Sequence, residues 1–147
     1  MNLLFIHETE YIEKVIFEYQ IVPEILASRG HNVYVVDFPS NWKKNSWFDL
    51  GTLRTKYLTG VKRANKKAGV TLIRPGFLKI PGISRLMAAI AYWWIIPAAL
   101  KRYRIDCVVL YSVPTNGLPT VFWAKRLGVP VFFRLFDVLH QLVPNST

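Results

Sequence analysis

The sequence predicts an α/β fold, a Rossmann-like doubly wound parallel sheet, in one domain that spans residues 1–147. Short apolar runs rich in β-branched residues alternate with longer segments of helical periodicity, which is typical of β-α-β units. The runs lack the apolar–polar alternation of half-exposed strands, so they favour strands buried on both faces. At 147 residues and 52% hydrophobic, the chain is long enough for one such core but not for two.

In the first half, the pattern predicts a strand at Leu3–His7, a helix at Ile12–Ser28 and a strand at Asn32–Phe38. Gly30 ends the helix. Pro23 lies well inside it and should bend it, because proline removes a backbone donor and crowds the preceding turn.

The second half repeats this order after a basic excursion. The expected elements are a strand at Val70–Arg74, a turn at Ile80–Ser84, a helix at Leu86–Leu100, a strand at Cys107–Tyr111, a helix between Gly117 and Gly128, and a strand at Val131–Phe136. Asn116 or Thr115 can cap the last helix. The uncharged run 86–100 is too short to span a bilayer, which needs about 20 residues. We favour packing of that run on the sheet; the alternative places Trp93 and Trp94 at a bilayer interface.

Several chemical classes are excluded by missing motifs. The turn after the first strand, residues 7–10, has no glycine, so the dinucleotide fingerprint is absent and Asp37 is better explained as a cap or crevice residue than as a ribose-binding acid. Ser112 lacks a nucleophile elbow, and three histidines with one cysteine make no recognisable metal set. We therefore expect no bound metal. The lone Cys107 cannot form an internal disulfide.

The net charge of +10 lies entirely within residues 40–85, where Asp49 is the only acid. Aromatic residues are interleaved with these cations, which predicts an insertion at about 40–69 that contacts an anionic membrane surface. The expected contact residues are Trp42, Lys43, Lys44, Trp47, Lys66 and Lys67. A solvated loop is the plainer alternative, and nucleic-acid binding is disfavoured because no recognised motif accompanies the charges.

Ligands of open α/β sheets bind at the carboxyl ends of the strands, so the segments that follow three predicted strands should line one crevice. The candidate substrate-binding residues are His7, Glu8, Thr9, Ser112, Thr115, Asn116, Gly117 and Arg134, and the candidate catalytic residues are Asp137 and His140. A carboxylate beside an imidazole can orient it and raise its basicity, as a proton acceptor requires. The plainer alternative is that Asp137 caps a helix and His140 is a surface residue.

Two stretches resemble a known family: GLPTVFWAKRLGVPVFFRLFDVLHQLVP near the end and EYQIVPEILASRGHNVYVVDF near the start. They are similar to the N-terminal domain of family 4 glycosyltransferases of the GT-B fold. The resemblance covers nearly the whole chain except residues 40–85. In that family a histidine often precedes the Asp after the fifth strand; here Phe136 stands in its place, while Asp137 matches.

The resemblance implies half of a GT-B enzyme, the half that binds the acceptor. The implied reaction transfers a sugar from a nucleotide sugar to a lipid-linked or polysaccharide acceptor at the membrane surface. The donor would bind mainly on a separate C-terminal domain or subunit, so this chain alone is expected to be inactive and to hold no cofactor. We expect a cytoplasmic protein peripheral to the membrane, because Met1–Ile6 shows no signal-peptide pattern. The alternative is a noncatalytic subunit that recruits a separate transferase to the membrane.

Overall fold

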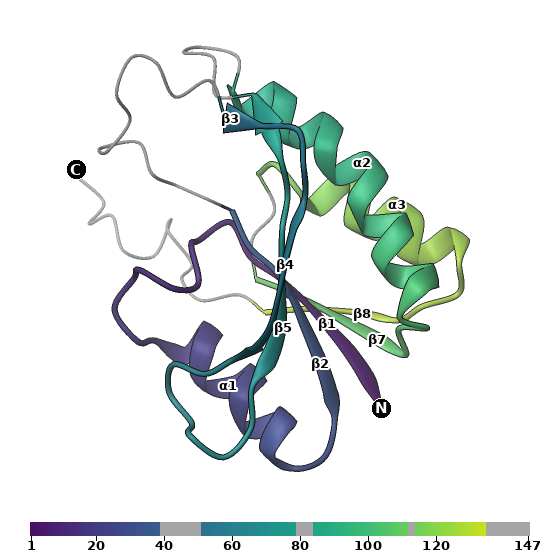
Figure 1. The fold of residues 1–147 in the computed structure, drawn as a ribbon. Coiled ribbons are helices and arrows are strands. Elements are labelled where there is room, and N and C mark those ends of the chain that lie inside the picture. The colour runs from purple at the N-terminus through teal and green to yellow at the C-terminus, as the bar shows by residue number, and fades with distance from the viewer. Residues whose placement is uncertain (39–50, 79–83, 112–113, 135–147) are drawn as a thin grey trace, which may run out of the picture.

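The structure is a computed structural model that describes residues 1–38, 51–78, 84–111 and 114–134. These residues form the predicted α/β fold, with a largely parallel sheet and helices on both of its faces (Figure 1). The strands are β1 Asn2–Ile6, β2 Asn32–Val36, β3 Gly51–Thr52, β4 Lys56–Val61, β5 Val70–Arg74, β6 Phe77–Leu78, β7 Cys107–Leu110 and β8 Val131–Phe133. The helices are α1 Glu18–Ser28, α2 Ser84–Arg102 and α3 Gly117–Arg126.

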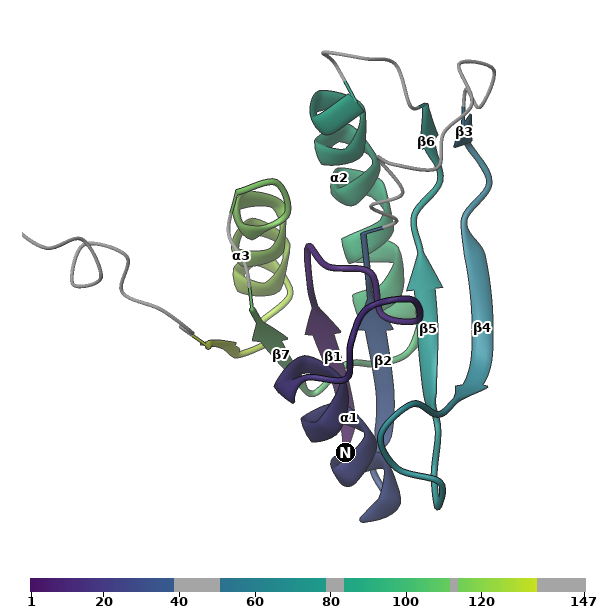
Figure 2. The same cartoon turned by 90° about the vertical axis from the view of Figure 1, so that its left-hand side faces the viewer.

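The main sheet has the order β4-β5-β2-β1-β7-β8, and Figure 2 shows its strands side by side. All neighbours are parallel except β4, which runs antiparallel to β5 along one edge. The strand order reverses at β1, which pairs with β2 on one side and with β7 on the other. This reversal is the switch point at which ligands of such sheets bind.

Alternate residues of β1 point into two separate cores. Leu3 and Phe5 pack with the side chains beneath α1, while Leu4 and Ile6 pack beneath α2. Figure 1 shows α1 on one face of the sheet and α2 with α3 on the other. Burial on both faces explains why the strand sequences show no alternation of apolar and polar residues.

Helix α2 lies on the sheet, as we favoured for residues 86–100. Ala88, Tyr92, Ile96 and Ala99 recur at helical spacing and are buried in the core with β1, β2 and β7. Among the described residues, no helix combines the length and the apolarity that crossing a membrane requires.

Helix α1 begins six residues later than the predicted start at Ile12. Phe17 is extended, and its N–H donates to the side-chain oxygen of Gln20, 2.7 Å away, so Gln20 satisfies the N-cap amide at the start of the helix. A start at Glu18 also places Pro23 nearer the helix N-terminus, where fewer backbone bonds precede it. The glycines predicted to end helices do so: Gly30 and Gly128 follow α1 and α3 with φ of 88° and 70°.

The described part of the predicted basic insertion contains strands, which the sequence did not indicate. Strand β4 forms the sheet edge, and β3 pairs with β6. Nearly every residue of β4 is exposed, so it carries no burial pattern that a sequence could reveal, and its register shifts between Leu58 and Val61. An edge strand with such an irregular register is less able to pair with other chains.

Candidate functional site

Two of the predicted segments meet at the switch point. The Oε1 atom of Glu8, just after β1, accepts hydrogen bonds from the backbone N–H groups of Thr115 and Asn116, the latter at 3.1 Å. The Asn116 side chain donates back to the carbonyl oxygen of His7 at 3.2 Å. The contacts span more than one hundred positions in sequence, and they join the carboxyl ends of β1 and β7 as predicted.

The Glu8 carboxylate occupies the amino end of α3. Asn116 is the N-cap residue of that helix but makes no side-chain cap, so the negative charge that favours this position comes from Glu8. Backbone N–H groups at a helix N-terminus commonly hold phosphate. Here the protein's own carboxylate fills that place, and Gly117 begins the helix buried behind it.

His7 is buried and not exposed to solvent. Its ring is 1% exposed and lies 4.8 Å from the ring centre of Tyr111 and 5.4 Å from that of Tyr19. Neither ring nitrogen has a hydrogen-bond partner within the described part of the chain. Burial lowers the pKa of His7 from 6.5 to about 3, so the imidazole is neutral in the folded protein.

This burial predicts a pH dependence of folding that His7→Phe should remove. Between pH 6.5 and 3 the unfolded chain binds a proton at this position that the folded chain does not, so the contribution of His7 to stability falls as pH falls, by about 1.4 kcal/mol per unit. Urea denaturation at intervals of pH should show the loss in the wild type and in a His31→Gln control, which retains His7. An unchanged slope in His7→Phe would contradict the buried neutral state.

A buried ionic cluster lies at the carboxyl ends of β2 and β5. The guanidinium Nη2 of Arg74 is 2.7 Å from Asp37 Oδ2 and 3.1 Å from Glu10 Oε1, and the Tyr11 N–H donates to Asp37 at 3.2 Å. Burial raises the pKa values of Asp37 and Glu10, and the positive charge of Arg74 opposes both rises. Asp37 is thus a buried, ion-paired residue, and it caps none of the described helices. Sequence reasoning missed Glu10 and Arg74, although Arg74, a charge at the end of a buried strand, was an available signal.

Tyr92 of α2 lies in the core next to the backbone of Asp37. It is fully buried, and its hydroxyl donates to the Asp37 carbonyl at 3.5 Å. Burial raises its pKa well above 10, and the charges of Asp37 and Glu8 raise it further. Tyr92 therefore stays protonated, and its hydroxyl joins α2 to the backbone of Asp37.

The remaining predicted residues are placed as follows. Thr9 is half-buried in the turn after β1. Arg134 follows β8, and its guanidinium pairs with Glu18 of α1 at 2.5 Å, so its partner is the start of α1 and not the Glu8 contacts. Lys66 and Lys67 are exposed in the loop between β4 and β5. This loop lies at the amino end of β5, whereas Glu8 follows the carboxyl end of β1.

Several predicted residues lie outside the described ranges, namely Trp42, Lys43, Lys44, Trp47, Ser112, Asp137 and His140. Their assignments stay predictions. Within the described ranges, histidine, cysteine and acidic side chains form no group of three that could hold a metal ion.

No family model matches this chain, and no curated protein matches it in sequence. A solved structure of similar fold is a UGT transferase from Siraitia grosvenorii in complex with UDP, with a TM-score of 0.52 and 16% identity. The likeness covers 90% of this chain and 27% of that one, so this chain spans about a quarter of the length of its neighbour. The described residues thus share the fold of part of a glycosyltransferase.

Proposed function

We propose that this chain is the acceptor-binding half of a glycosyltransferase, which moves a sugar from a nucleotide-sugar donor to a lipid-linked or polysaccharide acceptor at the cytoplasmic face of a membrane. The observation that carries the proposal is the Glu8 carboxylate at the switch point, on the amides of Thr115 and Asn116. The fold of the UGT transferase supports it, and so does the resemblance of the sequence to family 4 glycosyltransferases of the GT-B type.

The charge at this edge suits a sugar better than a diphosphate. A nucleotide sugar would need the α3 amides that Glu8 already occupies, and it would meet a carboxylate. A sugar hydroxyl can instead donate to Glu8, whose Oε2 atom has no hydrogen-bond partner among the described residues. Thr9 and Thr115 are half-buried beside it and offer further polar groups.

Transfer itself requires a donor-binding domain, as a further part of the polypeptide or as a second subunit. Within that assembly we assign the catalytic roles to Asp137 and His140, with the imidazole as proton acceptor and the carboxylate as its orienting group. In the noncatalytic alternative, in which the chain recruits a separate transferase to the membrane, neither residue would affect turnover.

Calorimetric titration tests whether the nucleotide-sugar donor binds to this chain or requires a separate domain. The 147-residue chain should show no tight binding of UDP or of a panel of nucleotide sugars and no transferase activity, because the start of α3 holds the Glu8 carboxylate where a diphosphate needs cations or free amides. Submicromolar binding of any nucleotide sugar by this chain alone would overturn the assignment of the acceptor half.

A further inference from the structure

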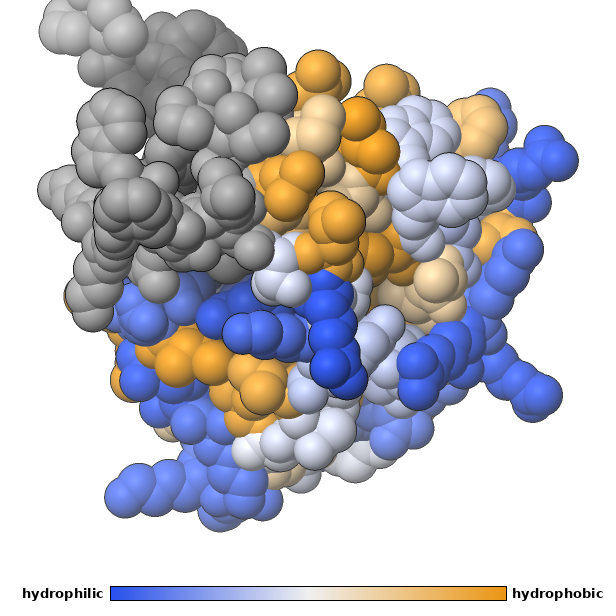
Figure 3. All heavy atoms as spheres, turned by 45° about the horizontal axis from the view of Figure 1, so that its top comes forward, coloured by the Kyte–Doolittle hydropathy of each residue, from blue (hydrophilic) through white to orange (hydrophobic). Residues whose placement is uncertain are grey.

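The outer face of α2 and α3, here called the helix face, exposes large apolar side chains in rows. On α2, Leu86, Ile90 and Trp94 follow one another at four-residue intervals and are 59%, 46% and 76% exposed. On α3, the exposed apolar residues are Leu118, Val121 and Phe122. Figure 3 shows apolar residues gathered on the surface toward the start of α2, with hydrophilic residues at the margin. A continuous apolar surface of this kind marks an interaction site.

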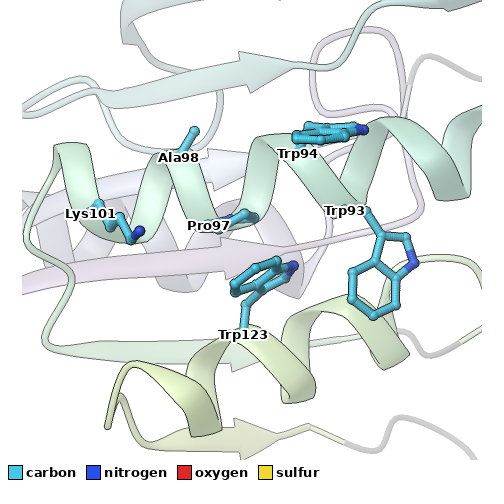
Figure 4. Close-up of a pocket in the computed structure, with 6 residues that line it drawn as sticks. All are labelled: Trp93, Trp94, Pro97, Ala98, Lys101 and Trp123. Atoms are coloured by element: carbon cyan, nitrogen blue, oxygen red, sulfur yellow. The ribbon is translucent and has the colours of Figure 1, made fainter.

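A groove runs between the two helices. Its volume is about 410 Å³, and it is lined by Trp93, Trp94, Pro97, Ala98, Lys101 and Trp123. Figure 4 shows the Trp123 ring rising from α3 toward α2 and the Trp93 ring reaching from α2 toward α3. Trp94 and Lys101 are two helical turns apart, so an apolar groove about 10 Å long ends at an ammonium group.

The charge on this face has one sign. Both helices end in a pair of cations, Lys101 with Arg102 and Lys125 with Arg126, and neither helix contains an acidic residue. The nearest acid in sequence, Asp106, is engaged by the backbone N–H of Asn2 at 2.7 Å. Lys101, Lys125 and Arg126 form no salt bridge with the acids that the structure describes. The helix face therefore complements an anionic surface.

We infer that the helix face docks on the surface of an anionic lipid bilayer, with an acyl chain in the tryptophan groove and a lipid phosphate at Lys101. Indole rings are favoured at the boundary between hydrocarbon and headgroups, and neighbouring cations add attraction to anionic lipids. A protein partner of ordinary composition would call for acids as well as cations on this face. The inference deepens the proposed function by locating the membrane contact, and its test requires no transferase activity.

Vesicle co-sedimentation with a matched pair of variants tests the inference. We expect Lys101→Gln/Lys125→Gln to bind phosphatidylglycerol–phosphatidylcholine vesicles about thirtyfold more weakly than the wild type, since each cation near the surface contributes roughly fivefold. The control, Lys14→Gln/Arg29→Gln, removes the same charge from exposed positions before and after α1, the helix on the opposite face of the sheet, and should change binding by less than about threefold. Thermal unfolding checks that each variant is folded.

A second variant tests the apolar contribution. Trp94→Ser/Leu118→Ser removes the most exposed apolar side chain of each helix and should weaken vesicle binding at least about tenfold. Equal loss in the Lys14/Arg29 control, or equal binding to vesicles of phosphatidylcholine alone, would overturn the inference. So would an absence of vesicle binding together with a dimer that Trp94→Ser/Leu118→Ser dissociates, which would identify a second copy as the occupant.

Discussion

Replacement of Arg74 with methionine should lower the free energy of unfolding by about 3–5 kcal/mol at neutral pH. The guanidinium is the only described cation paired with Asp37 and Glu10, whose side chains are 0% and 3% exposed. Methionine preserves much of the apolar stem but leaves two carboxylates buried without a counter-charge. The free energy of unfolding can be measured by urea denaturation at pH 7.

Acid should partly rescue the Arg74→Met variant. Burial already raises the pKa values of Asp37 and Glu10, and Arg74 opposes the rise, so its loss raises them further. The folded variant then binds protons more tightly than the unfolded chain, and its stability relative to the wild type recovers as pH falls from 7 toward 5. Arg29→Met, at an exposed position after α1, is the control and should change stability by less than about 0.5 kcal/mol. A deficit below 1 kcal/mol in Arg74→Met would show that the cluster is not held by its cation.

Replacement of Glu24 with glutamine should destabilise the protein by about 3 kcal/mol. Glu24 is fully buried in α1, where its carboxylate accepts hydrogen bonds from the Tyr11 hydroxyl and from the backbone N–H groups of Arg63, Ala64 and Asn65, at 2.6 to 3.1 Å. An amide would turn a donor toward some of these N–H groups and would lose the charge that strengthens every bond.

The loss at Glu24 should release the loop between β4 and β5 before the rest of the sheet. Hydrogen exchange should become faster at the amides of Arg63, Ala64 and Asn65, whose acceptor is removed. Glu13→Gln, at an exposed position in the segment before α1, is the matched control and should leave both stability and exchange unchanged. Unchanged exchange at these amides in Glu24→Gln would show that the Glu24 carboxylate does not hold the loop in place.

The fold could be predicted because its information is local. Runs such as residues 3–6 and 107–110 are apolar on every residue, which only strands buried on both faces require, and Gly30 and Gly128 mark the ends of α1 and α3. The start of α1 and strand β4 were not predictable in this way. The chain before α1 is held by Tyr11 N–H on Asp37 and by Gln20 on Tyr11, contacts that no local periodicity encodes. Strand β4 is defined by its pairing with β5 rather than by burial.

The site was predicted in part, for the same reason. Strand ends could be located, so Glu8, Thr115 and Asn116 were correctly expected at one edge of the sheet. The sequence did not show which charges form ion pairs, because Arg74 pairs with Asp37 and Glu10, which are 37 and 64 positions away in sequence. The sequence also could not reveal that His7 is enclosed by aromatic rings. The likeness to the UGT transferase confirms the fold, while membership of family 4 stays a prediction.

Amide-resolved NMR of the 147-residue chain, titrated in parallel with short oligosaccharides and with UDP, tests the acceptor-side assignment most directly. The amides of Thr115 and Asn116 report on the crevice itself, because both donate to Glu8. The account predicts that at least one oligosaccharide shifts these two signals, that Glu8→Gln weakens the effect, and that UDP leaves them in place. Shifts caused by UDP, with none caused by any oligosaccharide, would contradict the account and assign the donor to this half.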